Sequence, residues 1–198
     1  MANTQAPFGF RPIKTGAVPY SGAFSTLAAQ PTAGALNRGD MVTQLADGTV
    51  RPYAAADGHM ARGVYIGCHY LSAALGYPIW SNYWPGSGAL GSALIQVFVI
   101  DDPSVVFEVA ALAGPIAVAD IGQRAEANVL ASTTGFSKWS LTGLAVTATL
   151  PWIVTALGNS QAGTFAGVPI SDGYDSTTAY NIVEVAWNDM FLKTGLGI

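Results

Sequence analysis

The side chains in this sequence that are best suited to catalysis are Cys68 and the two histidines, His59 and His69. A cysteine thiolate beside an imidazole is the arrangement with which cysteine hydrolases begin their reaction. Cys68 and His69 are neighbours in a stretch with the composition of a β-strand, so their side chains should point to opposite faces and cannot pair directly. The Gly-x-Ser-x-Gly and His-Glu-x-x-His motifs are absent. We therefore expect no catalytic residues and no enzyme, and we expect Cys68 to be a small buried apolar side chain.

A glycine-rich segment, residues 86–91 (GSGALG), matches the Gly-x-Gly-x-x-Gly pattern that holds a pyrophosphate where a strand joins a helix. The context does not fit, because this segment leads into a second strand-like stretch, 94–100, rather than into a helix. No acidic residue follows about 20 positions later at the end of a second parallel strand. The segment is better interpreted as a loop before a strand, and we expect no cofactor.

Two acidic pairs could supply oxygen ligands to a calcium ion, which takes six to eight of them. They are Asp101-Asp102 and the loop that contains Asp172 and Asp175. The loop fits no recognised calcium-binding spacing, and an aspartate at a strand end or turn usually accepts hydrogen bonds from the local backbone. We therefore expect no metal site.

Aromatic residues are more suggestive than any polar group. Tyr77, Trp80, Tyr83 and Trp84 fall within eight residues, in a segment bounded by proline and glycine that is typical of a loop. Exposed aromatic clusters of this kind act as anchors at interfaces, although packing of one or two of them in a core is equally ordinary. The candidate interface residues therefore include Trp80, Tyr83 and Trp84.

A second aromatic group stands near the N-terminus, where two phenylalanines lie between two prolines. A segment of this kind becomes ordered only when it docks against a surface. It adds to the candidate interface Pro7, Phe8, Phe10, Arg11 and Pro12.

Charged residues make up only 10% of the 198-residue chain, whereas roughly 25% is usual. A lone soluble protein keeps more charge on its surface, so much of this surface should be covered by other protein.

The apolar stretch 90–100 is too short to cross a bilayer, and residues 1–12 lack the apolar segment of a secretory signal, so we expect no membrane partner and no export. Basic residues are scattered rather than clustered, which excludes nucleic acid as a partner. Residues 1–62 are mildly basic and 63–198 acidic, so a basic arm could lie on an acidic neighbour.

The distribution of glycine, proline and β-branched residues predicts an all-β fold, a barrel or sandwich, after an extended N-terminal arm. Residues 1–37 show no sustained period and are assigned to the arm, and 38–198 form the body, which could be two small β modules divided near 131–137. Residues 41–45 and 49–51 flank an Asp-Gly turn and predict a hairpin. The further predicted strands are 64–70, 94–100, 105–109, 116–118, 126–130, 144–150, 152–157 and 180–187.

Several of these segments together resemble a known family, the structural cement (capsid decoration) proteins of tailed bacteriophages. The resemblance is carried, in order along the chain, by 6–12 (APFGFRP), 38–42 (RGDMV), 63–68 (GVYIGC), 83–86 (YWPG), 100–103 (IDDP), 107–109 (FEV), 120–122 (DIG), and the ending from 180–181 (YN) to 187–188 (WN). It implies a β-rich, non-enzymatic virion protein, made in the host cytoplasm, that binds the outer surface of an icosahedral shell of major capsid protein and links adjacent capsomers. It implies no catalytic residues.

On this hypothesis the body lies at a junction between capsomers and the arm runs along a neighbour, where Phe8 and Phe10 become buried. Other copies of the chain are also expected partners, and a trimer is favoured over a dimer by analogy with other decoration proteins. The alternative from another class is a glycan-binding β domain on a virion surface that uses Trp80, Tyr83 and Trp84 as a stacking platform. An enzyme of unknown type is the third class.

Overall fold

The chain folds into β-strands joined by turns and loops. The computed structural model describes residues 7–29, 34–54, 61–89, 95–112, 114–129, 135–146, 150–158, 163–165, 168–170 and 179–190. The strands are β1 (Arg11–Thr15), β2 (Val18–Pro19), β3 (Ser25–Ala29), β4 (Leu36–Asn37), β5 (Met41–Gln44), β6 (Thr49–Pro52), β7 (Ala61–Leu71), β8 (Pro78–Ser81), β9 (Tyr83–Trp84), β10 (Gln96–Ile100), β11 (Val105–Ala110), β12 (Arg124–Val129), β13 (Trp139–Ala145), β14 (Trp152–Leu157), β15 (Gly163–Phe165), β16 (Val168–Ile170) and β17 (Ile182–Trp187). Within the described ranges, helical structure is limited to the 3-10 turn η2 (Val118–Asp120), and no helix there is long and apolar enough to span a bilayer.

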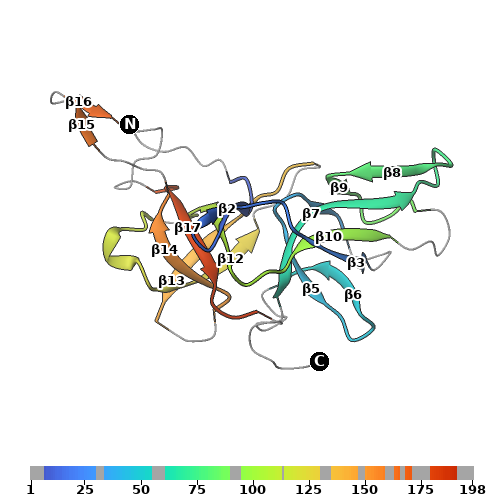
Figure 1. Ribbon diagram of the computed structural model, residues 1–198, viewed down its shortest axis with the longest axis horizontal. Coiled ribbons are helices and arrows are strands. Elements are labelled where there is room, and N and C mark those ends of the chain that lie inside the picture. Colours follow the sequence, from blue (N-terminus) through green and yellow to red (C-terminus); the bar gives the residue numbers. More distant parts are fainter. Residues whose placement is uncertain are drawn as a thin grey trace.

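Five strands, β3, β5, β6, β7 and β10, form a closed barrel on one side of the molecule (Figure 1). Their order is β10–β3–β6–β5–β7, and β10 pairs with β7 as well, which joins the two ends. The eleven-residue strand β7 makes this closure possible, because it pairs with β5 near its beginning, with β10 in its middle and with β8 at its end. Alternation along β10 fits a barrel wall: Val97 and Val99 are fully buried, whereas Gln96 and Phe98 are partly or fully exposed.

The other half of the molecule is a seven-stranded sheet with the order β13–β12–β14–β17–β11–β1–β2. All the pairings in this sheet are antiparallel. An isolated parallel bridge between Ala111 and Leu141 connects the end of β11 to β13, so the sheet curls toward closure. The sheet combines β11 to β14 and β17 with β1 and β2 from near the N-terminus.

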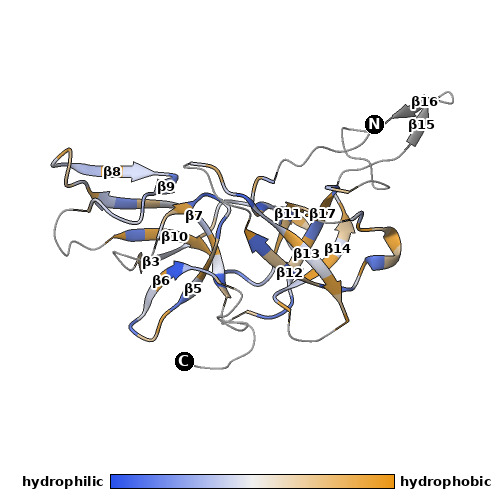
Figure 2. Cartoon of the chain, turned by 180° about the vertical axis from the view of Figure 1, so that it is seen from behind, coloured by the Kyte–Doolittle hydropathy of each residue, from blue (hydrophilic) through white to orange (hydrophobic). Residues whose placement is uncertain are grey.

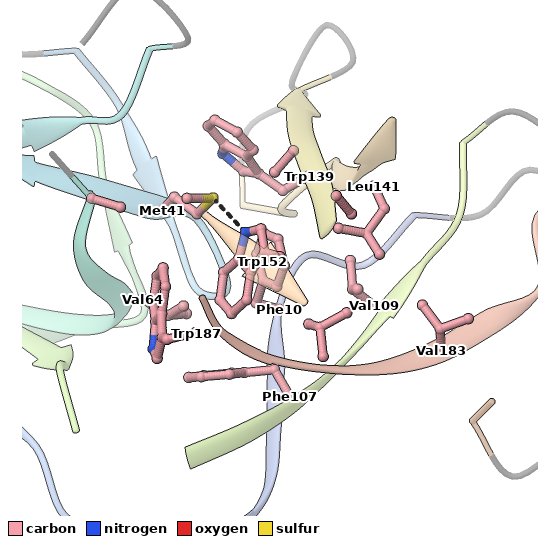
Figure 3. Close-up of a cluster of buried hydrophobic side chains, with 14 of the residues drawn as sticks. Phe10, Met41, Val64, Phe107, Val109, Trp139, Leu141, Trp152, Val183 and Trp187 are labelled. Carbon is pink, nitrogen blue, oxygen red and sulfur yellow. Dashed lines mark hydrogen bonds between the residues drawn. The ribbon is translucent and has the colours of Figure 1, made fainter. Parts of the chain in front are cut away.

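One hydrophobic core lies inside the curled sheet and extends to the barrel (Figure 3). The Trp152 indole is at its centre: it stacks on Trp187 with ring centroids 3.9 Å apart, and its Nε1 lies 3.3 Å from the sulfur of Met41. Met41 belongs to barrel strand β5, so this contact joins the two halves. A second core, which includes Tyr65, Trp84 and Val97, fills the barrel itself. The two halves therefore share packed side chains and are not independent domains joined by a linker.

The all-β prediction is confirmed. The hairpin is confirmed as β5 and β6, although its turn is not a two-residue turn with two positive φ angles: only Gly48 has a positive φ, +83°, and Asp47 accepts hydrogen bonds from Thr49. The strand at 152–157 is confirmed as β14. In β17, Val183, Val185 and Trp187 face the core as the alternation predicts, and Glu184 lies on the other face. The stretch 116–118 is not a strand, because it leads into the turn η2.

The N-terminal prediction needs correction. Residues 11–15 are strand β1 of the seven-stranded sheet and residues 25–29 are strand β3 of the barrel, so much of the expected arm is part of the body. The expected module boundary near 131–137 falls between β12 and β13 of one sheet. The chain passes from the barrel to the sheet between β10 and β11 instead.

Candidate functional site

Cys68 and His69 do not form a nucleophilic pair. They lie next to each other on β7, with Cys68 fully buried in the barrel core and the His69 ring on the other face, 4.5 Å from the Trp80 ring. Burial raises the pKa of the Cys68 thiol, and a hydrogen bond with Tyr65 only partly opposes this. A buried thiol with a raised pKa is not a nucleophile at neutral pH, so Cys68 has the packing role that the sequence predicts.

The aspartates at the end of β10 are occupied by protein groups. Asp101 accepts hydrogen bonds from Arg62 (2.7 Å) and from the Ser25 hydroxyl (2.8 Å). Asp102 accepts from the backbone N–H and the hydroxyl of Ser104, as expected for an aspartate in a turn. Among the residues that the structure describes, no three His, Cys, Asp or Glu side chains are grouped to hold a metal ion. The loop with Asp172 and Asp175 lies outside those residues, as does His59.

The glycine-rich segment turns the chain and packs closely against another loop. Gly86 and Gly88 have positive φ angles, +77° and +91°. A Cβ on Gly86 would lie 2.6 Å from the carbonyl carbon of Gly34, so glycine is needed there for close backbone packing. This gives a structural reason for at least the first glycine of the pattern. Residues 90 and 91 lie outside the described chain.

The aromatic segment 77–84 is not a loop, and the structure divides its rings between core and surface. Pro78–Ser81 form β8 and Tyr83–Trp84 form β9, which pairs with β4. Trp84 is fully buried against Tyr70, with ring centroids 4.8 Å apart, and Tyr83 is half-buried. Trp80 is 70% exposed. Of the three predicted interface rings in this segment, Trp84 is therefore a core residue and Trp80 is the exposed one.

Trp80 belongs to a row of aromatic side chains across the outside of the barrel, which we call the aromatic row. It runs from Trp80 on β8 to Phe98 on β10 (stacked, centroids 5.3 Å apart) and to Phe24 just before β3 (5.0 Å from Phe98). Gly67 lies between them in register with Phe98, and its lack of a side chain lets the rings meet across β7. Phe24 and Phe98 were not predicted from the sequence, because they are 74 residues apart and adjacent only through the pairing of β3 with β10.

The chain segment that contributes Trp80 and Phe98 to the aromatic row has no charged residue. Residues 63–100 include no aspartate, glutamate, lysine or arginine. Leu75 and Tyr77, at the tip of the β7–β8 hairpin, are also more than half exposed. Figure 2 accordingly colours β8 pale rather than blue. An exposed, uncharged group of large side chains is the usual mark of a contact surface.

A second exposed apolar group lies at the other end of the molecule. Val118 and Ile121, at the turn η2, are 71% and 43% exposed. In Figures 1 and 2 this turn and strand β8 are at opposite ends of the long axis. The molecule therefore presents exposed apolar side chains at both ends of its long axis.

The N-terminal segment lies on its own chain. Phe10 is 2% exposed and stacks on Trp152, so it is a core residue and not a free interface residue. Arg11 forms an ion pair with Glu108, and the Lys14 ammonium lies 2.5 Å from the Glu184 carboxylate. The prediction of a basic arm on an acidic neighbour thus describes an intramolecular contact, in which β1 lies on the acidic part of the same chain.

Residues of the same N-terminal segment form one wall of a pocket of about 240 Å³, which we call the arginine pocket. Arg11 lies over the Phe8 ring, with its Cζ 5.2 Å from the ring centroid. Pro7 precedes the pocket and is half-buried. The pocket is lined by Phe8, Phe10, Arg11, Pro12, Arg38 and Ile66. The first four of these lining residues are among the predicted interface residues. Arg38 and Ile66 are not, since nothing local in the sequence indicates that β7 and the turn after β4 meet the N-terminal segment.

Comparison with known proteins adds no relative. The chain matches no family model, no curated protein and no solved structure.

Proposed function

We propose that the protein is a non-enzymatic structural component of a virion, which binds the outer surface of an icosahedral phage capsid and cements adjacent capsomers of major capsid protein. The observation that carries the proposal is the aromatic row with Trp80 at its exposed end, two of whose rings come from residues 63–100, which include no charged residue. Exposure of these apolar side chains to water is energetically unfavourable, and contact with another protein surface buries them. The resemblance of the sequence to cement proteins supplies the identity of the partner.

The expected gain per copy is substantial. Covering Trp80 and Phe24, which are 70% and 51% exposed, would contribute on the order of 5 kcal/mol before the costs of association. Many copies bind one shell, so a small net gain per copy becomes large for the particle. The second apolar group, at η2, gives the molecule another place to touch a neighbour, which a protein that bridges two capsomers requires.

The glycan-binding alternative has a narrower basis. Its three-ring platform would need Trp84 at the surface, and Trp84 is fully buried. Only Trp80 and the half-buried Tyr83 remain available. One face of Trp80 already stacks on Phe98, so a sugar would find a smaller platform than the sequence suggests.

Co-sedimentation with expanded, undecorated capsids tests the proposal. We expect saturable binding at a fixed ratio of about one, or about one third, per major capsid subunit, as lattice symmetry requires. Trp80→Ser and Phe24→Ser should weaken binding at least about tenfold, the equivalent of 1.4 kcal/mol. The matched control is Phe136→Ser, because Phe136 is 74% exposed but is not part of the aromatic row. Absence of binding by the unaltered protein would reject the cement function. Binding to a glycan array that depends on Trp80 would then favour the alternative.

A further inference from the structure

We propose that the arginine pocket binds the side-chain carboxylate of an acidic residue, flanked by apolar residues, in an extended segment of a partner protein. The inference rests on the proposed function only for the identity of that partner, since the pocket chemistry is a property of this chain. It concerns a surface separate from the aromatic row, and it specifies what the second protein should present there.

The floor and walls of the pocket are apolar and held in place. Phe10 forms part of the lining, and its ring is fixed by stacking on Trp152. Its backbone N–H donates to the Gly39 carbonyl oxygen (2.9 Å), which ties the N-terminal segment to the turn that carries Arg38. Phe8, Pro12 and Ile66 complete the apolar lining. A site whose walls are already ordered loses little entropy when a ligand enters.

The turn that carries Arg38 is fixed in the same way. The backbone N–H of Arg38 donates to the Asn82 carbonyl oxygen (3.1 Å), and that of Gly39 donates to the Tyr65 carbonyl oxygen (2.8 Å). The side chain of Arg38 is exposed, and in the described parts of the chain no carboxylate forms an ion pair with its guanidinium. Burial raises the pKa of Tyr20; Asp102 raises it further and Arg38 lowers it. The Asp102 carboxylate itself accepts hydrogen bonds from Ser104. Arg38 therefore offers a fork of donors at the pocket rim.

Arg11 provides the second guanidinium. It donates to Glu108 through Nε and Nη2, and a guanidinium has five N–H donors in all, so further donors remain. Both arginines line one pocket, and Glu108 pairs with only one of them. A carboxylate between them would gain charge-assisted hydrogen bonds and reduce the repulsion between the two cations.

The chemistry favours a single carboxylate on a protein over a polyanion. Residues 63–198 carry nine acidic against three basic residues, so a nucleic acid or polyphosphate would be repelled by most of the molecule. The apolar lining accepts a neighbouring aliphatic side chain, which a free inorganic anion lacks. An internal Asp or Glu between apolar residues satisfies both features of the pocket.

The test uses the isolated full-length protein and short peptides, with NMR detection of the amide resonances of Phe10, Arg11, Gly39 and Ile66. Ac-Leu-Glu-Leu-NH2 should produce saturable shifts at these residues. Ac-Leu-Gln-Leu-NH2, which differs only in charge, should bind at least about tenfold more weakly. A third peptide, Ac-Leu-Leu with a free C-terminal carboxylate, tests whether the pocket binds the carboxylate of a chain end instead of that of a side chain.

Substitutions then locate the binding group. Arg38→Gln should weaken binding of the glutamate peptide at least about tenfold, and Arg38→Lys should weaken it less, because lysine keeps the charge but not the planar fork. Arg124→Gln, four strands from β1 in the same sheet, is the control and should leave binding unchanged. Arg11→Gln would also remove the ion pair with Glu108, so a loss of binding in that variant could have two causes. The Arg38→Gln variant is therefore the one that tests the proposal. Equal binding of the glutamine peptide, binding of the free-terminus peptide alone, or an Arg38→Gln variant that binds normally would each overturn the proposal.

Failure of this proposal and of the proposed function can be told apart. Peptide binding is measured without capsids, so it can succeed when co-sedimentation fails, and that result would reject the cement function alone. Capsid binding that depends on Trp80 while no peptide binds would reject the arginine pocket alone.

Discussion

The Phe10 ring stacks on the Trp152 indole, with ring centroids 4.3 Å apart and an angle of 15° between the planes. The two residues are 142 positions apart in the sequence. Through this contact a residue from the N-terminal segment completes the core of a sheet built mainly from the last part of the chain. The contact also makes truncation a poor test of interface function, because removing residues before Gly39 would delete β1 and β3 and disrupt both halves.

Point substitutions at Phe10 and Phe8 separate core from surface. Phe10→Ala should lower the free energy of unfolding by about 3–5 kcal/mol, because it removes a fully packed ring. Phe8→Ala should lower it by about 1 kcal/mol or less, because Phe8 is only half-buried. Urea denaturation measures both. Equal losses in the two variants would contradict the assignment of Phe10 to the core.

The close approach of the N-terminal segment to the loop before β13 depends on Gly9. Its φ is +79°, and a Cβ there would lie 2.2 Å from the Ser137 hydroxyl oxygen and 2.7 Å from the Gly39 carbonyl oxygen. Gly9→Ala should therefore lower the unfolding free energy by roughly 3 kcal/mol, through strain of about 1–2 kcal/mol plus the clash. Gly16→Ala is the matched control, since φ is +58° but nothing lies within 4 Å of the added Cβ. If thermal denaturation shows the same loss for both, the steric part of the argument is wrong.

The ion pairs of β1 compensate for two carboxylates that face each other. Glu108 and Glu184 are directly opposite in the β11–β17 pairing, and each also pairs with a basic residue of β1. Lys14→Gln should lower the unfolding free energy by about 1 kcal/mol, because the repulsion between the carboxylates is then less compensated. Adding Glu184→Gln should recover part of that loss. The effect should shrink in high salt, and a double-mutant cycle by urea denaturation at two salt concentrations measures it. If Glu184→Gln instead lowers the unfolding free energy of the Lys14→Gln variant further, the basic residues of β1 do not compensate for repulsion between the carboxylates.

Asp40 should make stability depend on pH. Burial raises its pKa above the usual 3.8, and hydrogen bonds with Ser137 and Asn37 only partly offset this. A carboxyl group whose pKa is higher in the folded state binds more protons when folded, so between the unfolded and folded pKa values stability falls as the pH rises. Asp40→Asn removes this dependence. Relative to the unaltered protein, the variant should therefore gain stability as the pH rises from about 4 to 7.

Asp47 provides a control of opposite sign for that experiment. Hydrogen bonds with Thr49 lower its pKa, so its contribution to stability is lost as the pH falls. Asp47→Asn should lose stability relative to the unaltered protein as the pH rises from about 2 to 4, below the range in which Asp40 acts. Urea denaturation at several pH values compares both variants. The same trend in both variants would show that neither carboxyl group is responsible.

Local sequence signals predict strands well where the alternation of side chains is regular. The strands β14 and β17 and the β5–β6 hairpin belong to this class, because each has an apolar face and a defined turn or end. Strand β1 was not predicted. Its sequence RPIKT has a proline and two charges, and it is held by pairing with β11 and by ion pairs to residues far along the chain.

The candidate site shows the same limit. Trp80 and Trp84 are four positions apart and have similar neighbours, yet one is 70% exposed and the other fully buried. The difference arises from pairing, because β9 pairs with β4 beside the barrel core, whereas β8 is added at the end of β7. Sequence composition indicates that aromatic anchors are present. Only the pairing of distant strands determines which ring is available to a partner.

The position of β1 imposes an order on assembly during synthesis. All five barrel strands lie within residues 25–100, so the complete barrel emerges from the ribosome before β11 does. Strand β1 emerges first but has no sheet to join until β11 follows, since Arg11 and Glu108 are 97 residues apart. Pairing over such a separation is slow, and domains generally fold in the order in which they are made. The earliest segment to be synthesised thus reaches its final position only after the barrel strands and β11 have been made, and the stacking of Phe10 on Trp152 waits for β14.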